Sequence, residues 1–179
     1  MDSLAIIGKY YDAGTELYQL LIKHSRSVAE KALAIAKSHP EMDLSLSFIE
    51  EAAMLHDMGI IFCNAPEIGC HGTFDYVCHG YLGADLLRKE GFPRHALVCE
   101  RHTGTGISLQ MIVNNNLPLP YTDFVPVSLE EQLICFADKF FSKTEPEIEK
   151  DVIDIQMSLR KYGEDVVSRF NHWCSLFLR

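Results

Sequence analysis

Hydrophobic residues recur at three- and four-residue spacing along much of the chain, which is the period of a helix buried on one face. In residues 15–38 such a face carries Leu17, Leu21, Val28, Ala32 and Ile35, and Pro40 closes the segment. The same pattern predicts further helices over residues 46–57, 80–90, 93–103, 128–141, 147–161 and 164–178. The hydrophobic pattern is therefore almost wholly helical.

Turn-forming residues separate these helices and predict where they begin and end. Ser47 with Glu50, and Ser128 with Glu131, have the spacing of capping boxes. Gly59 is expected to end the helix of residues 46–57. Residues 61–78 and 104–127 are rich in Gly, Pro and Asn, so we expect irregular structure, with one short helical piece in the second segment. No stretch indicates a strand, and we expect an all-α, single-domain bundle over residues 1–179.

Composition narrows the class of protein. The chain has 179 residues, of which 47% are hydrophobic and 23% charged, and no apolar run is long enough to span a bilayer. An acidic residue at position 2 and the lack of a basic start argue against a secretory signal, so we expect a cytoplasmic protein that does not bind membranes. The six cysteines form no CxxC pair and are expected to be reduced. A net charge of −9 disfavours a nucleic acid duplex as partner.

Six ionisable residues fall on the apolar faces or at the ends of the predicted helices. A lone histidine there is usually a hydrogen-bonded core residue, but a buried carboxylate without a partner costs several kcal/mol. Six such residues on five helices call for one explanation, and a metal centre supplies it. The candidate ligands are His24, His56, Asp57, His79, His102 and Asp138.

The number and type of these ligands indicate which ions they suit. Four imidazoles and two carboxylates exceed the needs of one ion and suffice for two that share a bridging carboxylate. Ligands with only nitrogen and oxygen donors favour iron or manganese, with magnesium, cobalt and zinc as further candidates. We therefore expect divalent metal ions, two in number, as cofactors.

In this order the six residues resemble the motif of the HD superfamily of metal-dependent phosphohydrolases. The surrounding sequences are similar too, over roughly residues 20–145, and residues 146–179 would add C-terminal helices. The doublet in AAMLHDMG, with the two additional histidines, looks like the short stand-alone HDIG-type hydrolases. The stretches that carry the resemblance are HSRSVAEKALAIA, AAMLHDMG, HGYLGADLLRKEGFP, CERHTGTGI and LEEQLICFADKF.

The resemblance implies a reaction and a role for each ligand. His24, His56 and Asp138 would hold one ion, His79 and His102 the other, and Asp57 would bridge them. A metal-activated hydroxide would then cleave a phosphoester or phosphoanhydride. The substrate would be a small phosphorylated compound, with a nucleotide or dinucleoside polyphosphate favoured.

One position departs from the family pattern. Relatives often carry Lys or Arg directly after the HDxG motif, where this chain has Ile60. A phosphate contact would then come from elsewhere, with Lys139 favoured as a catalytic cation and Arg101 and His71 as substrate-binding residues. Lys89 and Arg94 are further candidates for the missing positive charge.

Alternatives stay open at this point. Some proteins with the HD fold bind a di-iron pair through the same ligand types and activate dioxygen. A non-catalytic ligand-binding module is a third interpretation, although all six ligand positions are retained. The sequence also leaves the oligomeric state open, with a homodimer through the terminal helices as one arrangement.

Overall fold

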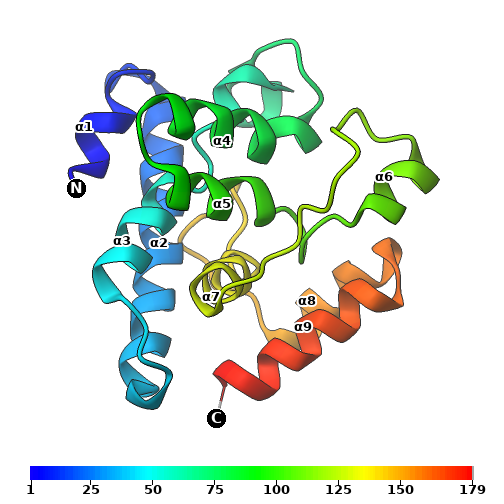
Figure 1. Cartoon of the computed structure of the whole chain (residues 1–179). Helices are drawn as coiled ribbons and strands as arrows, with labels where there is room; N and C mark the ends of the chain where they lie inside the picture. Colours follow the sequence, from blue (N-terminus) through cyan, green and yellow to red (C-terminus); the bar gives the residue numbers. More distant parts are fainter. Residues whose placement is uncertain (179) are drawn as a thin grey trace.

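The structure, a computed structural model, describes residues 1–178 and is built from α-helices joined by short 3-10 turns (Figure 1). The predicted all-α class is confirmed. The helices are α1 (Ser3–Ile7), α2 (Glu16–Ser38), α3 (Leu46–Leu55), α4 (His79–Lys89), α5 (Pro93–Arg101), α6 (Leu109–Asn115), α7 (Leu129–Asp138), α8 (Val152–Leu159) and α9 (Glu164–Phe177).

Side chains at the helix starts explain the observed boundaries. Thr15 caps α2 by accepting a hydrogen bond from the amide of Tyr18 at 3.2 Å. The expected cap of α3 at Ser47 is wrong by two residues, because Ser45 accepts the amide hydrogen of Phe48 instead. At α7 the predicted cap is present, and Ser128 accepts from the amide of Glu131 at 3.2 Å.

Helix α7 occupies the middle of the bundle (Figure 1), where it contacts α2, α3, α5 and α9. Its Phe136 is fully buried and lies 5.4 Å from the ring of Phe170 and 5.5 Å from that of Phe177, both on α9. Buried hydrophobic side chains of α1 to α5 and of α7 to α9 form one core cluster, and Ile112 of α6 belongs to a second, smaller cluster. Because α7 is packed on several sides, its C-terminal residue is held firmly in the interior.

The segment between α3 and α4 is irregular, as predicted, but it does contain a small sheet. It runs through η2 (Ile60–Phe62), β1 (Asn64–Ala65), η3 (Pro66–Ile68), β2 (Cys70–His71) and η4 (Tyr76–Cys78). The two strands pair antiparallel with Asn64 opposite His71. The expectation of no strand is wrong here, because two-residue strands are too short to show an alternating pattern.

Two further boundaries differ from the predictions. Helix α1 lies in a part of the chain for which no helix was expected, and its five residues are capped by Asp2. The helix predicted over residues 147–161 begins later, as α8, because Asp151 caps it by accepting from the amide of Asp154 at 2.8 Å. It then continues as the 3-10 turn η5 (Arg160–Tyr162). Within residues 1–178, no helix has the length and hydrophobicity to cross a membrane.

A close approach between glycines fixes how α4 lies against the end of α3. Gly59 has a φ of −88°, so it is no left-handed helix stop, and α3 already ends at Leu55. A Cβ on Gly59 would lie 2.0 Å from the carbonyl oxygen of His79 and 2.5 Å from the amide of Gly83. Because neither Gly59 nor Gly83 has a side chain, the N-terminus of α4 can pack directly against the segment that carries His56 and Asp57.

Candidate metal centre

The six residues predicted as metal ligands come together in one buried cluster. His24 lies in the middle of α2, His56 and Asp57 directly follow α3, and His79 begins α4. His102 directly follows α5, and Asp138 is the last residue of α7. Each of the six is no more than 7% exposed, and His56 and Asp57 are fully buried. Helix ends converge here, so five segments distant in sequence share one site.

The carboxylate of Asp57 lies between two groups of imidazoles. Its Oδ2 is 3.3 Å from Nε2 of His24 and 3.2 Å from Nε2 of His56. Its Oδ1 is 3.4 Å from Nε2 of His79 and 3.3 Å from Nε2 of His102. Each oxygen therefore faces a different pair, which is the arrangement expected of a bridging carboxylate.

Asp138 completes the first of these groups. Its Oδ1 is 3.0 Å from Nε2 of His24 and 3.5 Å from Nε2 of His56. In the second group, the Nε2 atoms of His79 and His102 are 3.0 Å apart. Two sets of residues could each hold an ion, because the ligand atoms within each set lie no more than 4.8 Å apart. One set is His24, His56 and Asp138, and the other is His56, Asp57 and His102.

Backbone carbonyls fix the orientation of three of the imidazoles. In each, Nδ1 lies within hydrogen-bonding distance of the carbonyl three residues earlier, so this nitrogen carries a proton and Nε2 is the ring atom that faces the cluster. A donor on the opposite ring nitrogen is the usual support of a metal-ligating histidine. The pairs are His56 with Ala53 at 2.6 Å, His79 with Tyr76 at 2.6 Å, and His102 with Cys99 at 2.7 Å.

This arrangement fits a divalent cation and is hard to explain without one. The Nε2 lone pairs of His79 and His102 face each other at 3.0 Å and also face a carboxylate oxygen. Within residues 1–178, buried Oδ1 of Asp57 and Nε2 of His56 find no hydrogen-bond partner of ordinary geometry. Buried acceptors that converge in this way are stabilised by a metal ion placed among them.

Burial and charge perturb the pKa values of the cluster. Burial, reinforced by His102, lowers the pKa of His79 to about 3. Burial also acts to lower the pKa of His56, but the carboxylates of Asp57 and Asp138 outweigh it and raise that pKa to about 9. Burial opposes ionisation of Asp57, yet Lys143 and His56 hold its pKa well below the usual range. The carboxylates are therefore ionised and ready to bind cations.

Two lysines of the segment after α7 contact the two carboxylates. Lys139, the predicted catalytic cation, has its Nζ 2.8 Å from Oδ2 of Asp138, the oxygen that does not face the imidazoles. It also donates to the carbonyl of His102 at 3.4 Å. This geometry supports a role in positioning Asp138, and direct catalysis by Lys139 stays a prediction.

Lys143 was missed by sequence reasoning. Its Nζ is 2.7 Å from Oδ2 of Asp57, and its side chain is only 16% exposed. The ammonium also lies 5.7 Å from the centre of the Tyr76 ring. Nothing in the local pattern separates Lys143 from a solvated lysine, and its one signal in the sequence is its place five residues after Asp138. Ile60 is fully buried in the core, and Lys143 brings a positive charge to the doublet from another segment.

The other predicted substrate contacts lie away from the cluster. Arg101 pairs with buried Glu131 at 2.9 Å, and His71 is an exposed residue of β2. Arg94 stacks 4.2 Å above the ring of Phe48, and Lys89 is exposed in the last turn of α4. Among the described residues, the structure thus joins only the two lysines after α7 to the ligand cluster.

Three thiols support the backbone around the ligands. Cys99 donates to the carbonyl of His56 at 2.9 Å, and Cys135 donates to that of His102 at 3.2 Å. Cys63 lies 3.7 Å from the carbonyl of Gly59. The six cysteines are unpaired, and all but Cys174 are buried, which agrees with their predicted role as core thiols.

Comparison with known proteins now decides the family. A family model of the HD domain matches residues 21–142, which include all six clustered residues. The chain belongs to the HD domain family. HD domains define a superfamily of metal-dependent phosphohydrolases, whose members bind divalent metals through such His and Asp clusters.

Three relatives illustrate the range of proteins that carry this domain. A tRNA (cytidine(56)-2'-O)-methyltransferase of Thermoplasma volcanium is 31% identical over 94% of this chain and 44% of its own length. An uncharacterised protein of Methanocaldococcus jannaschii is 32% identical over 74% of this chain and 73% of its own. A second methyltransferase of the same name, from Picrophilus torridus, is 28% identical over 80% of this chain and 36% of its own. The chain thus spans less than half of either methyltransferase. No solved structure matches.

Proposed function

We propose that this HD-domain protein hydrolyses a phosphoester or phosphoanhydride bond of a small phosphorylated substrate, with two divalent metal ions as cofactors. The observation that carries the proposal is the buried carboxylate of Asp57, whose two oxygens face separate imidazole pairs at 3.2–3.4 Å. His24, His56 and Asp138 would hold one ion, His79 and His102 the other, and Asp57 would bridge. Iron or manganese suits these donors best.

Bound divalent ions would lower the pKa of a water and neutralise phosphoryl oxygens. In the reaction, the water oxygen bonds to phosphorus and the P–O bond to the leaving group breaks. One water proton goes to the leaving oxygen, and the other stays on the phosphate or passes to solvent. Lys143 and Lys139 would provide cations for the phosphoryl oxygens, and Lys139 would also keep Asp138 in place.

The decisive experiment combines metal analysis with a phosphate-release assay on the purified protein. It uses Mn²⁺ or Fe²⁺ and a panel of nucleotides, dinucleoside polyphosphates, cyclic dinucleotides and sugar phosphates. Asp57→Asn should remove one or both ions and reduce phosphate release by more than about 100-fold, while the protein stays folded. Asp43→Asn, at an exposed turn position with a φ of 49°, is a matched control because asparagine is tolerated there.

Three outcomes would redirect the proposal. Full activity of the Asp57→Asn protein would refute the two-ion site as the reaction centre. A wild-type protein that consumes oxygen with bound Fe²⁺, and releases no phosphate, would favour the di-iron alternative. Metal binding without either reaction would favour a non-catalytic ligand-binding module.

Other aspects of the function stay separate proposals. The tRNA methylation named for two relatives is not included, because more than half of each of those proteins lies outside the matched length. We also propose a cytoplasmic location, which suits the unpaired thiols, and no partnership with duplex nucleic acid or membranes. A homodimer through the terminal helices is a further proposal, which a mass measurement in solution would test.

A further inference from the structure

Positive charge is distributed unevenly around the ligand cluster. Nζ of Lys143 lies 2.7 Å from Oδ2 of Asp57, the oxygen that faces the first pair of imidazoles. Nζ of Lys139 lies 2.8 Å from Oδ2 of Asp138, which belongs to the same group of ligands. Both ammonium groups therefore lie against carboxylates of one half of the cluster. We call it the lysine half, and its ligands are His24, His56, Asp138 and Oδ2 of Asp57.

The other half of the cluster, which we call the histidine half, consists of His79, His102 and Oδ1 of Asp57. Within residues 1–178, Lys139 and Lys143 are the only lysines or arginines that pair with a carboxylate of the cluster. An ion at the histidine half would bind Asp57 through a different oxygen from the one that Lys143 contacts at 2.7 Å. This half is therefore the less hindered place for a first ion.

The imidazoles of the two halves also differ in how they are held. Nδ1 of His79 and of His102 lies 2.6 and 2.7 Å from a backbone carbonyl that accepts its hydrogen. Nδ1 of His24, in contrast, is buried and has no hydrogen-bond partner in the described part of the chain. Loss of such a supporting partner typically lowers metal affinity or activity about 10–100-fold. The lysine half thus contains one ligand without support.

An ammonium group and a metal ion compete for the same carboxylate oxygens. Asp57 is fully buried and Lys143 largely so, which means that little water screens two positive charges at this point. A divalent ion at the lysine half would have to share Oδ2 of Asp57 with the ammonium group or displace it. The lysine half should therefore bind a divalent ion more weakly than the histidine half, although it has the additional carboxylate of Asp138.

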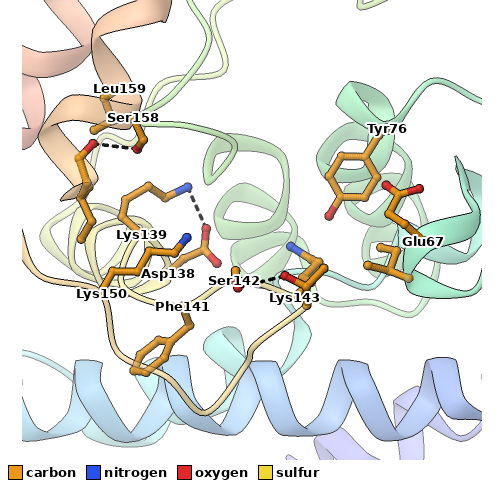
Figure 2. Close-up of a pocket in the computed structure, with 13 residues that line it drawn as sticks. Glu67, Tyr76, Asp138, Lys139, Phe141, Ser142, Lys143, Lys150, Ser158 and Leu159 are labelled. Carbon is orange, nitrogen blue, oxygen red and sulfur yellow. Dashed lines mark hydrogen bonds and ion pairs between the residues drawn. The ribbon is translucent and has the colours of Figure 1, made fainter.

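An anion beside the two lysines would change this balance. Asp138, Lys139 and Lys143 line one cavity of about 390 Å³, which has room for a phosphate group. Figure 2 shows the ammonium group of Lys139 joined to Asp138, with Lys143 and Ser142 among the other residues that line the cavity. Phosphate oxygens are strong acceptors for ammonium groups. A phosphate bound here would draw the lysines from the carboxylates and offset the charge of an incoming ion.

We infer that the two ions bind unequally: the first binds tightly at the histidine half, and the second binds weakly at the lysine half unless a phosphate group binds with it. Lys143 and Lys139 impose this order because they hold the carboxylates that the second ion needs. The inference rests on the proposed two-ion site and adds a condition to it. The site would be completed by the arrival of a phosphorylated compound.

Titration of the purified protein with Mn²⁺, followed by calorimetry, tests the order of binding without any turnover. In phosphate-free buffer, the dissociation constant of the second ion should be at least about tenfold higher than that of the first. Inorganic phosphate should lower the second constant about tenfold or more. By linkage, the second Mn²⁺ should tighten the binding of phosphate by the same factor, which is an independent check.

Substitutions of the lysines show whether they cause the inequality. Lys143→Met should lower the dissociation constant of the second ion about tenfold in phosphate-free buffer and reduce the effect of phosphate. Lys143→Arg keeps the charge and should keep the second ion weak. Lys150→Met is the matched control, because Lys150 lines the same cavity and pairs with no carboxylate of the cluster within residues 1–178. It should change neither constant.

Two histidine substitutions assign the ions to the halves. Metal analysis after gel filtration in phosphate-free buffer should show that His79→Ala has lost the tight ion. The His24→Ala protein should retain that ion and lose the phosphate-dependent one. Circular dichroism checks that both variants are folded, and the titrations of the unsubstituted protein and of the lysine variants decide the inference if either is not.

The outcomes distinguish this inference from the proposed function. Equal dissociation constants for the two ions without phosphate, or a weaker second ion in Lys143→Met, would overturn the inference while phosphate release from a substrate is still observed. Retention of the tight ion in a folded His79→Ala protein would overturn the assigned order. Unequal binding that is coupled to phosphate, in a protein that hydrolyses no phosphorylated compound, would support the inference and contradict the proposed hydrolysis.

Discussion

Replacing Lys143 by methionine would remove the ammonium that lies 2.7 Å from the carboxylate of Asp57. Asp57 is fully buried, and the side chain of Lys143 is 16% exposed, so the pair is largely shielded from water. Loss of one partner from a buried pair costs about 3–5 kcal/mol, and we expect about 2–4 kcal/mol here because Lys143 is partly exposed and His56 also lies 3.2 Å from Asp57. For a chain of this length the loss corresponds to a fall in Tm of roughly 4–16 °C.

Thermal unfolding followed by circular dichroism measures this effect in chelator-treated protein. Lys150→Met serves as the control, because Lys150 is an exposed lysine that lines the same cavity as Lys143 (Figure 2). In the presence of Mn²⁺ the difference between the two variants should shrink, because the bound ions neutralise Asp57 in place of the ammonium. Equal Tm values for the two metal-free variants would refute the view that Lys143 compensates the buried charge.

Two further substitutions test how the site is built. Gly83→Ala puts a Cβ 2.6 Å from Sγ of Cys99, so we expect a loss of about 1–3 kcal/mol in the free energy of unfolding and weaker Mn²⁺ binding, whereas Gly14→Ala should change neither. Denaturant unfolding and metal titration measure both effects, and normal metal affinity in Gly83→Ala would argue against the close approach as a requirement. Arg101→Ala should lower stability by about 1–3 kcal/mol, because buried Glu131 loses its partner, and should leave KM unchanged. A large rise in KM would restore Arg101 as a substrate contact.

Much of the fold followed from periodicity and from helix-terminal residues. Helix α2 begins one residue after the predicted start, because Thr15 both ends the preceding loop and caps the helix. The start of α8 could not be placed in this way, since Asp151 and the upstream acidic residues offer several equivalent caps. The short strands at Asn64 and Cys70 arise from the turn between them rather than from any alternation of side chains.

The ligand set could be predicted because burying a charged or polar group has a large free-energy cost, which makes such residues conspicuous on an apolar helix face. His24 and Asp138 are 114 positions apart in sequence and 3.0 Å apart in space, yet each was identified from its own helix. Lys143 could not be found in this way, because it lies in an irregular segment where a lysine has no unfavourable position. Lys143 reaches Asp57 because of the path that the loop takes after α7, and the spacing of hydrophobic residues does not specify that path.

The order of the ligands along the chain has a consequence for biosynthesis. Five of the six precede residue 103, but the sixth, Asp138, ends α7, the helix around which the others are arranged. During translation, a chain that stops before α7 would carry five of the six candidate ligands but would lack Asp138, so the site would be incomplete. Ion binding by all six residues would therefore have to wait until α7 has docked against the helices that carry the other five.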